Sequence, residues 1–407
     1  MIDVTAVHPK SPYLSSQRRG YMRIVVDILV AAVAGLIVWL STSAYDRHHL
    51  NSETRTFVQS ANDLIRAERY DDVLRLYSRL PKEVQDNKRV DSTLLRAKIL
   101  KSAMEQDAFG TYDKDRLDEL QTDAEFRNNH EHTAETSALL GIIASLRDHP
   151  AKAVEHFKEA IRLDPDDART YNYWGVTYMT WRMGEGSDSW EVAAEKKFQK
   201  AAAVNSKYEW PLINLGLLEM NKGELDSQTQ SPSHLEAAHT YFTNAASAQP
   251  KNPNALMDLG VSSIELGRWY GRHGDKAKGI EYIGEASKEF KAAHELGLDS
   301  APLHVNWGEL SEILEQPEEA KAHFESALRI RPRYFEACLD LAELLEKVNS
   351  QEPAKQAYAS CRDIESELSS QLAARITSAD DSAVSGVLRD QKRRVDEQVS
   401  ELMAKTR

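Results

Sequence analysis

A phrase of six residues recurs along this chain, and it constrains the fold more than any other feature. It consists of a large residue and glycine, followed at fixed offsets by alanine, an aromatic residue, alanine and proline. The first copy is Leu140, Gly141, Ala153, Phe157, Ala160 and Pro165. The second copy, with identical offsets, is Trp307, Gly308, Ala320, Phe324, Ala327 and Pro332. Such a phrase is typical of stacked helix–turn–helix units of about 34 residues, and this architecture makes a self-contained active site unexpected.

Further copies of the phrase fill the region between these two and follow the second. Their paired small and aromatic residues are Gly175 with Phe198, Gly216 with Phe242, Gly260 with Phe290, and Ala342 with Tyr358. Residues 134–366 therefore comprise six units in one register, and this region resembles the tetratricopeptide repeat (TPR) family. The resemblance implies an all-α fold in which helix pairs stack into a right-handed solenoid.

The remaining segments complete the predicted domain organisation. Residues 50–130 look like divergent TPR-like helix pairs, while residues 367–407 leave the repeat pattern. We interpret this tail as a C-terminal helical region that caps the last repeat. A partner-binding or coiled-coil helix is the alternative. The apolar run in residues 21–45 and the tail in residues 1–20 form the N-terminal part.

Residues 24–40 are almost entirely apolar and predict a transmembrane helix. Extended to residues 21–45, the segment reaches the roughly 20 residues that span a bilayer. Four basic residues precede position 24 against one acidic residue, so the positive-inside rule places residues 1–20 in the cytoplasm and the repeats across the membrane. Asp27 is a candidate partner contact in the membrane, and Trp39 is a candidate interfacial aromatic residue. A cleaved signal peptide is the alternative.

Composition excludes some classes of function. The chain has 407 residues with a formal net charge of −13, which argues against a sequence-independent nucleic-acid binder. The two cysteines, Cys338 and Cys361, occupy positions where small residues pack within one unit. We interpret them as buried small hydrophobic residues, with a disulfide or redox pair as the alternative.

The resemblance implies a concave groove lined by the first helix of each unit. Reading the groove positions in register gives an apolar, Met-rich middle and an acidic C-terminal end. The candidate partner-groove residues are Asn172, Val176, Met179, Ile213, Leu217, Met220, Met257, Val261 and Ile264. Apolar groove positions suit an amphipathic helix or an extended apolar peptide. The alternative is that the chain's own tail or loops fill the groove, or that superhelical curvature buries these positions.

Three consecutive units carry extra residues between their two helices, around residues 181–192, 222–235 and 267–279. Equivalent turns of consecutive repeats lie on one edge of a solenoid, so the insertions should form one surface. The candidate insertion-edge residues are Trp181, Arg182, Trp190, Arg268, Trp269, Tyr270 and Arg272. These are residue types enriched at interface hot spots. The alternative is that the insertions merely lengthen the helices.

The sequence contains none of the common catalytic or phosphate-binding patterns, such as HExxH, GxSxG or GxxxxGK[ST]. The histidines at positions 130 and 132 lack a second cluster at metal-ligand spacing. We therefore expect no catalytic residues, no cofactor, no metal and no small-molecule substrate, and predict that the chain is not an enzyme.

Three functional hypotheses follow. The first is a membrane-anchored scaffold or assembly factor that mediates protein–protein interactions in an envelope complex, located in a bacterial inner membrane with periplasmic repeats. The second is an organelle-surface receptor that captures amphipathic targeting peptides. The third is a structural subunit of a membrane enzyme complex. All three predict protein partners.

Overall fold

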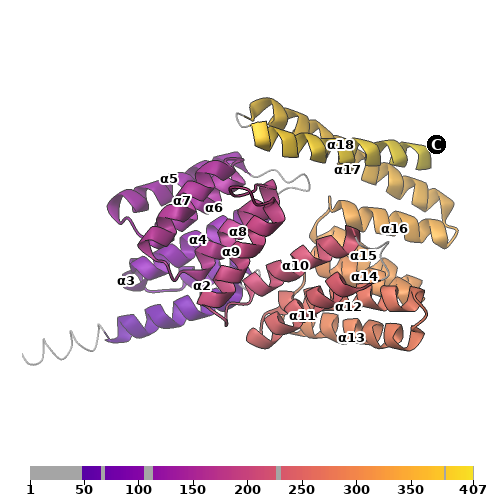
Figure 1. The fold of residues 1–407 in the computed structure, drawn as a ribbon, viewed down its shortest axis with the longest axis horizontal. Helices are drawn as coiled ribbons and strands as arrows, with labels where there is room; N and C mark the ends of the chain where they lie inside the picture. The colour runs from indigo at the N-terminus through magenta and orange to yellow at the C-terminus, as the bar shows by residue number, and fades with distance from the viewer. Residues whose placement is uncertain (1–47, 66–68, 105–112, 226–230, 380–381, 407) are drawn as a thin grey trace, which may run out of the picture.

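The structure is a computed structural model that describes residues 48–65, 69–104, 113–225, 231–379 and 382–406. Residues 48–65 are helical. The labelled helices are α2 (Tyr70–Ser78), α3 (Lys82–Gln85), α4 (Lys88–Met104), α5 (Lys114–His130), α6 (Ala134–Leu146), α7 (Pro150–Leu163), α8 (Ala168–Trp181), α9 (Trp190–Val204), α10 (Trp210–Leu225), α11 (Ser233–Ala248), α12 (Pro253–Arg272), α13 (Lys276–Glu295), α14 (Ala301–Ile313), α15 (Pro317–Ile330), α16 (Phe335–Lys347), α17 (Gln351–Ser378) and α18 (Ser382–Lys405). The predicted all-α, TPR-type solenoid is confirmed (Figure 1).

The recurring phrase is explained by one contact inside each helix pair. In the pair α6–α7, a Cβ atom placed on Gly141 would lie 2.5 Å from the ring of Phe157. In α14–α15, the same atom on Gly308 would lie 2.4 Å from the ring of Phe324. Both rings are fully buried. The small residue therefore lets an aromatic ring lie directly against the backbone of the neighbouring helix, which locks the two helices at close range.

The turn between the two helices also repeats. The fifteenth residue of four units has a positive φ, and these residues are Asp148, Arg182, Glu315 and Asn349. This left-handed conformation ends the first helix and reverses the chain. Proline follows two residues later at the start of α7 and α15, where its missing N–H costs no helical hydrogen bond.

The insertions take different forms. Between α8 and α9, residues 182–189 form a loop in which an isolated β-bridge joins Glu185 and Asp188. Between α12 and α13, the extra residues lengthen both helices, which are 20 residues each. The prediction that helices are merely lengthened therefore holds for this third insertion. The second insertion is partly outside the described residues, which omit 226–230.

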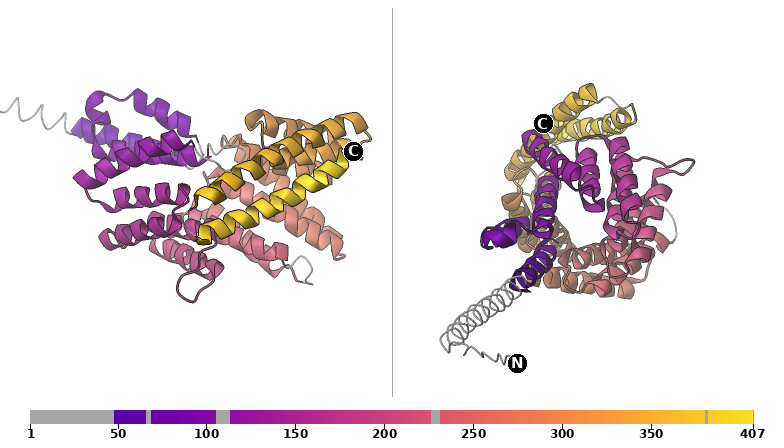
Figure 2. Two further views of the ribbon diagram at one scale, coloured as in Figure 1. Left: turned by 90° about the horizontal axis from the view of Figure 1, so that it is seen from above. Right: turned by 90° about the vertical axis from the view of Figure 1, so that its left-hand side faces the viewer.

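The C-terminal tail folds back onto the first half of the solenoid. Helix α17 has 28 residues, so it provides the second helix of the last repeat and continues beyond it to pair with α18. The resulting C-terminal hairpin (α17 beyond residue 366, and α18) runs back from the last repeat, and one of its ends reaches the N-terminal half of the molecule (Figure 2). Arg375 of α17 donates to Asp148 at 2.8 and 3.1 Å, across 227 residues of sequence. The solenoid thus closes on itself.

The predicted localisation is corrected. Among the helices that the structure describes, none combines the length and the apolar character that crossing a bilayer requires. Their apolar residues are instead spaced to pack on neighbouring helices, with charged residues between them. The assignment as a single-pass inner-membrane protein with periplasmic repeats is therefore not retained. The segment from which it came, residues 21–45 with Asp27 and Trp39, lies outside the described residues.

The interpretation of the cysteines is corrected in part, because both are buried as expected but they form the disulfide that was the alternative. A disulfide joins Cys338 of α16 to Cys361 of α17, with a distance of 5.6 Å between the Cα atoms. These residues occupy the fourth and twenty-seventh positions of the last repeat, which the helix pair brings face to face. Alanine occupies the twenty-seventh position in the other five units. A spacing of 23 residues does not reveal this pairing, because it depends on the packing of two helices.

Candidate binding site

The described residues enclose a cavity of about 1340 Å³ between the first half of the solenoid and the C-terminal hairpin. Its walls are formed by α4, α6, α8 and α10 on one side and by α17 and α18 on the other. The side chains of Leu368, Leu372 and Arg375 from α17, and of Gln391 and Val395 from α18, line the second side. The returning tail therefore forms one wall of the cavity.

One apolar cluster fixes the hairpin to the first half of the solenoid. Trp181, at the end of α8, is 6% exposed and packs with Leu372, Val384, Leu388 and Val395. Its indole Nε1 donates to the backbone oxygen of residue 145 at 3.2 Å. A tryptophan with a buried ring and a satisfied N–H provides a large apolar area in one fixed orientation. Trp181 therefore anchors the closure of the solenoid.

Ion pairs support the same closure. The bidentate pair between Arg375 and Asp148 is partly shielded from solvent, with side chains 21% and 25% exposed. Arg182 and Asp390 form a longer pair, at 3.4 Å between nitrogen and oxygen, with more exposed side chains. A bidentate, half-buried pair is geometrically specific, whereas an exposed single contact contributes little. The first pair therefore fixes the position of the hairpin more strongly.

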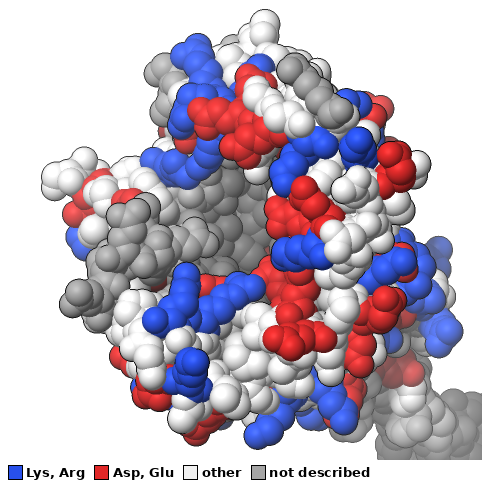
Figure 3. All heavy atoms as spheres, turned by 90° about the vertical axis from the view of Figure 1, so that its right-hand side faces the viewer, with Lys and Arg blue, Asp and Glu red and all other residues white. Residues whose placement is uncertain are grey.

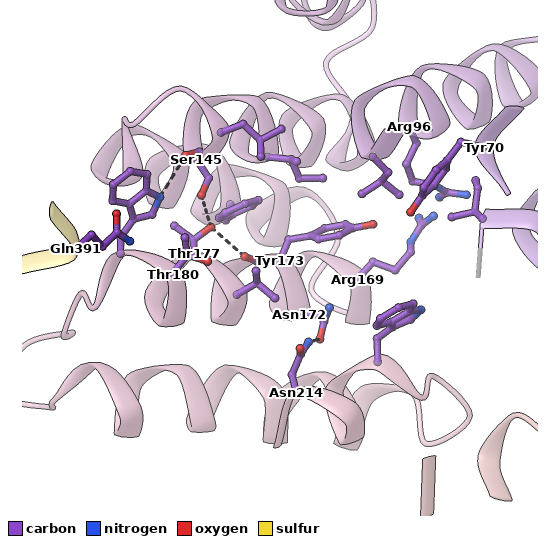
Figure 4. A pocket seen from close by; sticks show the side chains of 18 of the residues that line it. Tyr70, Arg96, Ser145, Arg169, Asn172, Tyr173, Thr177, Thr180, Asn214 and Gln391 are labelled. Carbon is purple, nitrogen blue, oxygen red and sulfur yellow. Dashed lines mark hydrogen bonds between the residues drawn. The ribbon is translucent and has the colours of Figure 1, made fainter. Parts of the chain in front are cut away.

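One end of the cavity is built from arginine and tyrosine side chains. Arg96 of α4 is 6% exposed and its guanidinium donates to the side-chain oxygen of Asn62. Arg169 and Tyr173 project from the first turns of α8, and Tyr208 precedes α10. Figure 4 shows Arg96, Arg169 and the hydroxyl of Tyr173 directed toward one another. We call these four residues the arginine–tyrosine end.

The electrostatics of this end follow from burial. Burial, and then the charge of Arg169, lower the pKa of Arg96. Burial raises the pKa of Tyr173 and, more strongly, that of Tyr208, so both phenols stay protonated at neutral pH. Burial lowers the pKa of Arg169, but Asp167 and Glu135 outweigh it and the net shift is upward. The four residues of this end therefore carry hydrogen-bond donors that are charged or firmly protonated, while Asp166 and Asp167 line the same cavity.

The middle of the cavity is lined by amides and hydroxyls that satisfy one another. The side-chain amide of Asn214 donates to the side-chain oxygen of Asn172 at 2.9 Å, linking α10 to α8. The hydroxyl of Thr177 donates to that of Ser145 at 3.1 Å, linking α8 to α6 (Figure 4). Val176 lies between these pairs in the sequence of α8 and also lines the cavity. These contacts hold consecutive first helices in register.

The structure divides the predicted groove residues into three groups. Asn172 and Val176 line the cavity. Ile213 and Ile264 are buried in the hydrophobic core, at 1% and 3% exposure. The remaining five are half-buried along α8, α10 and α12, and we call them the apolar stripe: Met179, Leu217, Met220, Met257 and Val261. The structure therefore places the predicted groove residues partly in the cavity and partly beyond it.

The predicted insertion-edge residues mostly contact their own molecule. Trp181 is in the closure cluster, and Trp190 packs against the N-terminal core. Trp269 stacks on the ring of His273, with centroids 3.9 Å apart. Tyr270 stacks on Tyr282 and lies under the ammonium group of Lys278, 3.8 Å from the ring centroid.

The arginines of this edge are paired as well. Arg268 contacts Glu265 at 2.6 Å and Glu309 at 3.0 Å, and Arg272 donates to the backbone oxygen of residue 268. Arg182 is paired with the hairpin as described above. The aromatic and basic residues of the insertions therefore stabilise the solenoid and its closure, and a partner would have to displace or share these contacts.

Charges of both signs alternate around the hollow of the C-terminal half (Figure 3). Inside this half, burial and then the neighbouring Glu309 raise the pKa of Asp340 to about 7. Burial raises the pKa of Glu289 to about 7 as well. Asp340, on the first helix of the last repeat, and Glu289, on the second helix of the fourth, are therefore only partly ionised at neutral pH.

Sequence reasoning missed most of the arginine–tyrosine end. Arg169 was identifiable as a groove cation from the repeat register. Arg96 lies in the divergent region, where no register could be assigned, and Tyr208 lies in the turn before α10. Tyr173 occupies a position next to the groove positions.

Comparison with known proteins supports the fold. Residues 301–334 match the family model described as "Tetratricopeptide repeat". No curated protein matches the chain in sequence. Among solved structures, the APC/C hetero-tetramer Cut9–Hcn1 matches with a TM-score of 0.55 and 16% identity, over 82% of this chain and 55% of that chain. This chain therefore spans about half the length of that relative.

A second structure, a monomeric IFIT1 mutant with Gppp-AAAA, matches with a TM-score of 0.53 and 13% identity, over 84% of this chain and 75% of that chain. At these identities the likeness concerns the fold alone. Residues 301–334 therefore match a tetratricopeptide repeat unit, and the solenoid as a whole has a TPR-type fold.

Proposed function

We propose that this chain is a non-catalytic scaffold that binds a protein partner along its apolar stripe. The observation that carries the proposal is the position of the five stripe residues on three consecutive first helices, which contact one another. Their side chains are only half-buried although they are large and apolar. An amphipathic helix that covered them would remove this surface from water, and methionine adapts to varied partners.

Two further points favour a scaffold. The apolar stripe lies beyond the cavity, so the C-terminal hairpin does not line the same surface. The Cut9–Hcn1 structure is described as a hetero-tetramer, which shows that a solenoid of this shape can be held in an assembly. The role of assembly factor for a multi-protein complex follows, and capture of amphipathic targeting peptides or permanent membership of an enzyme complex are the alternatives.

The test is affinity purification of the full chain with the double substitution Leu217→Glu and Val261→Glu. Two carboxylates in the middle of the stripe should abolish the recovery of the partner, because an apolar helix cannot bury them unpaired. The matched control is Phe126→Glu with Ile280→Glu, since these side chains are 61% and 73% exposed. Both variants must keep the helical circular dichroism of the native chain. Unchanged recovery with the stripe variant would refute the proposal.

A further inference from the structure

The arginine–tyrosine end has unused hydrogen-bonding capacity. Neither phenol hydroxyl, of Tyr173 or of Tyr208, makes a hydrogen bond to another of the described residues, and both residues are half-buried at the cavity wall. The cavity is large enough to hold water or a ligand at this position, so these donors are available to an occupant.

The guanidinium of Arg169 is available in the same way. Its Nε atom lies 3.3 Å from a carboxylate oxygen of Asp167, and the structure gives no other polar contact of this side chain among the described residues. That carboxylate is also occupied, because Asp167 caps α8 by accepting from the backbone N–H of residue 169 and from the hydroxyl of Thr170. The side chain of Arg169 is 43% exposed, and it lines the cavity. Its terminal N–H groups therefore face the interior space.

Arg96 adds a second positive charge at short range. Its guanidinium is held by Asn62 and lies 3.7 Å from a carboxylate oxygen of Glu135, which is beyond good hydrogen-bond distance. Glu135 and Asp167 balance part of the charge of the two guanidinium groups, and an anion between them would interact favourably with both. Two arginines and two protonated phenols that line one part of a cavity provide the kind of donors that bind oxyanions.

We propose that the cavity binds a small organic anion, with a phosphate or carboxylate head held by Arg96, Arg169, Tyr173 and Tyr208. The body of the ligand extends along α8 toward the C-terminal hairpin, past the linked amides of Asn172 and Asn214. The apolar side chains of Ile142, Leu146 and Val176 cover it. This site is separate from the apolar stripe, so a result that refutes one of the two proposals does not refute the other. The proposed molecule is a ligand that is bound and not converted. The proposal therefore leaves the prediction of no small-molecule substrate unchanged.

The test uses three probes of similar shape, phenyl phosphate, benzoate and neutral benzamide, titrated into the full chain by isothermal calorimetry. At least one anion should bind with 1:1 stoichiometry and at least ten times more tightly than benzamide. The tighter anion identifies the head group as phosphate or carboxylate. Raising the salt concentration should weaken the binding of the anion and leave that of benzamide unchanged.

Substitutions then locate the site. Arg169→Gln should weaken the binding of the anion at least tenfold, and Tyr173→Phe, which keeps the ring and removes one donor, should weaken it about three- to tenfold. The matched control is Arg162→Gln, because Arg162 is exposed and pairs with Glu159 on α7, outside the cavity. Equal affinity of the three probes for the native chain, or full affinity for an anion in both cavity variants, would overturn the proposal.

Discussion

Two repeats of this chain share the recurring phrase, but their other residues make different contacts. The unit at residues 134–167 and the unit at residues 301–334 have the same offsets, the same Gly–Phe contact and the same left-handed turn. The first contributes Ser145 and Asp148 to the cavity wall and to the closure of the solenoid. The second carries His304 and His323 instead. The phrase therefore builds the helix pair, and the residues between its fixed positions decide what the pair contacts.

The largest effect should follow from breaking what the two units share. Phe157→Ala and Phe324→Ala each remove a fully buried ring, and each should lower the free energy of unfolding by about 3–5 kcal/mol. Urea denaturation followed by circular dichroism measures this. If the two losses differ by more than about 2 kcal/mol, the units are not energetically equivalent and the comparison fails.

A slightly smaller loss of stability should follow from reducing the disulfide, which distinguishes the last repeat from the other five. Its disulfide closes a loop between residues separated by 23 positions, and chain entropy predicts a stabilisation of about 3 kcal/mol. Reduction with a phosphine should lower the melting temperature of the native chain. The control is Cys338→Ala with Cys361→Ala, which should melt at the lower temperature and should not respond to the reductant. A native chain that melts identically in both states would show that helix packing alone holds this repeat.

The closure of the solenoid should be measurable at the first unit. Asp148→Ala, Arg375→Ala and their combination form a double-mutant cycle, and we expect a coupling energy of about 1–2 kcal/mol for this bidentate pair. The exposed pair of Arg182 and Asp390 provides the comparison, with an expected coupling below about 1 kcal/mol. Equal coupling in the two cycles would mean that the hairpin is not fixed by the Arg375 contact.

The smallest predicted effect is a dependence on pH in the second unit. Burial, and then the nearby His304 and His294, lower the pKa of His323 to about 4. The unfolded chain therefore binds the proton more readily, so the stability contributed by neutral His323 is present above about pH 6.5 and is lost as the pH falls toward 4.

Denaturation midpoints at pH 7 and pH 5 test this prediction. His323→Gln should reduce the difference between the two pH values, because glutamine does not titrate. The ring of His323 stacks on Trp307, and Asp299 contacts His304 at 2.9 Å. These neighbours are the same in the native chain and in the variant, so their effect on the pH dependence is common to both. His132→Gln is the control, since this histidine is half-exposed. If the difference between the midpoints at pH 7 and pH 5 is the same in the His323 variant as in the native chain, His323 does not cause the pH dependence of this unit.

The fold could be predicted largely from the sequence, and the site only in part. The spacing of Gly141 and Phe157 identified a helix pair without any knowledge of its neighbours, because the contact is made within about one repeat. Arg169 was recognisable as a groove cation for the same reason. Its pairing in space with Arg96 was not, because Arg96 lies 73 residues away in a region without a readable register.

The sequence by itself determined the units, that is, their paired helices and the close approach of a small residue to an aromatic ring within each pair. These depend on interactions between residues separated by fewer than about 34 positions, and a repeated pattern displays them. Only the tertiary structure decided that Cys338 meets Cys361, that Trp181 is covered by the chain's own C-terminal hairpin, and that a cavity lies between them. Those contacts depend on the small rotation from each repeat to the next, which accumulates along the solenoid and which no single unit encodes.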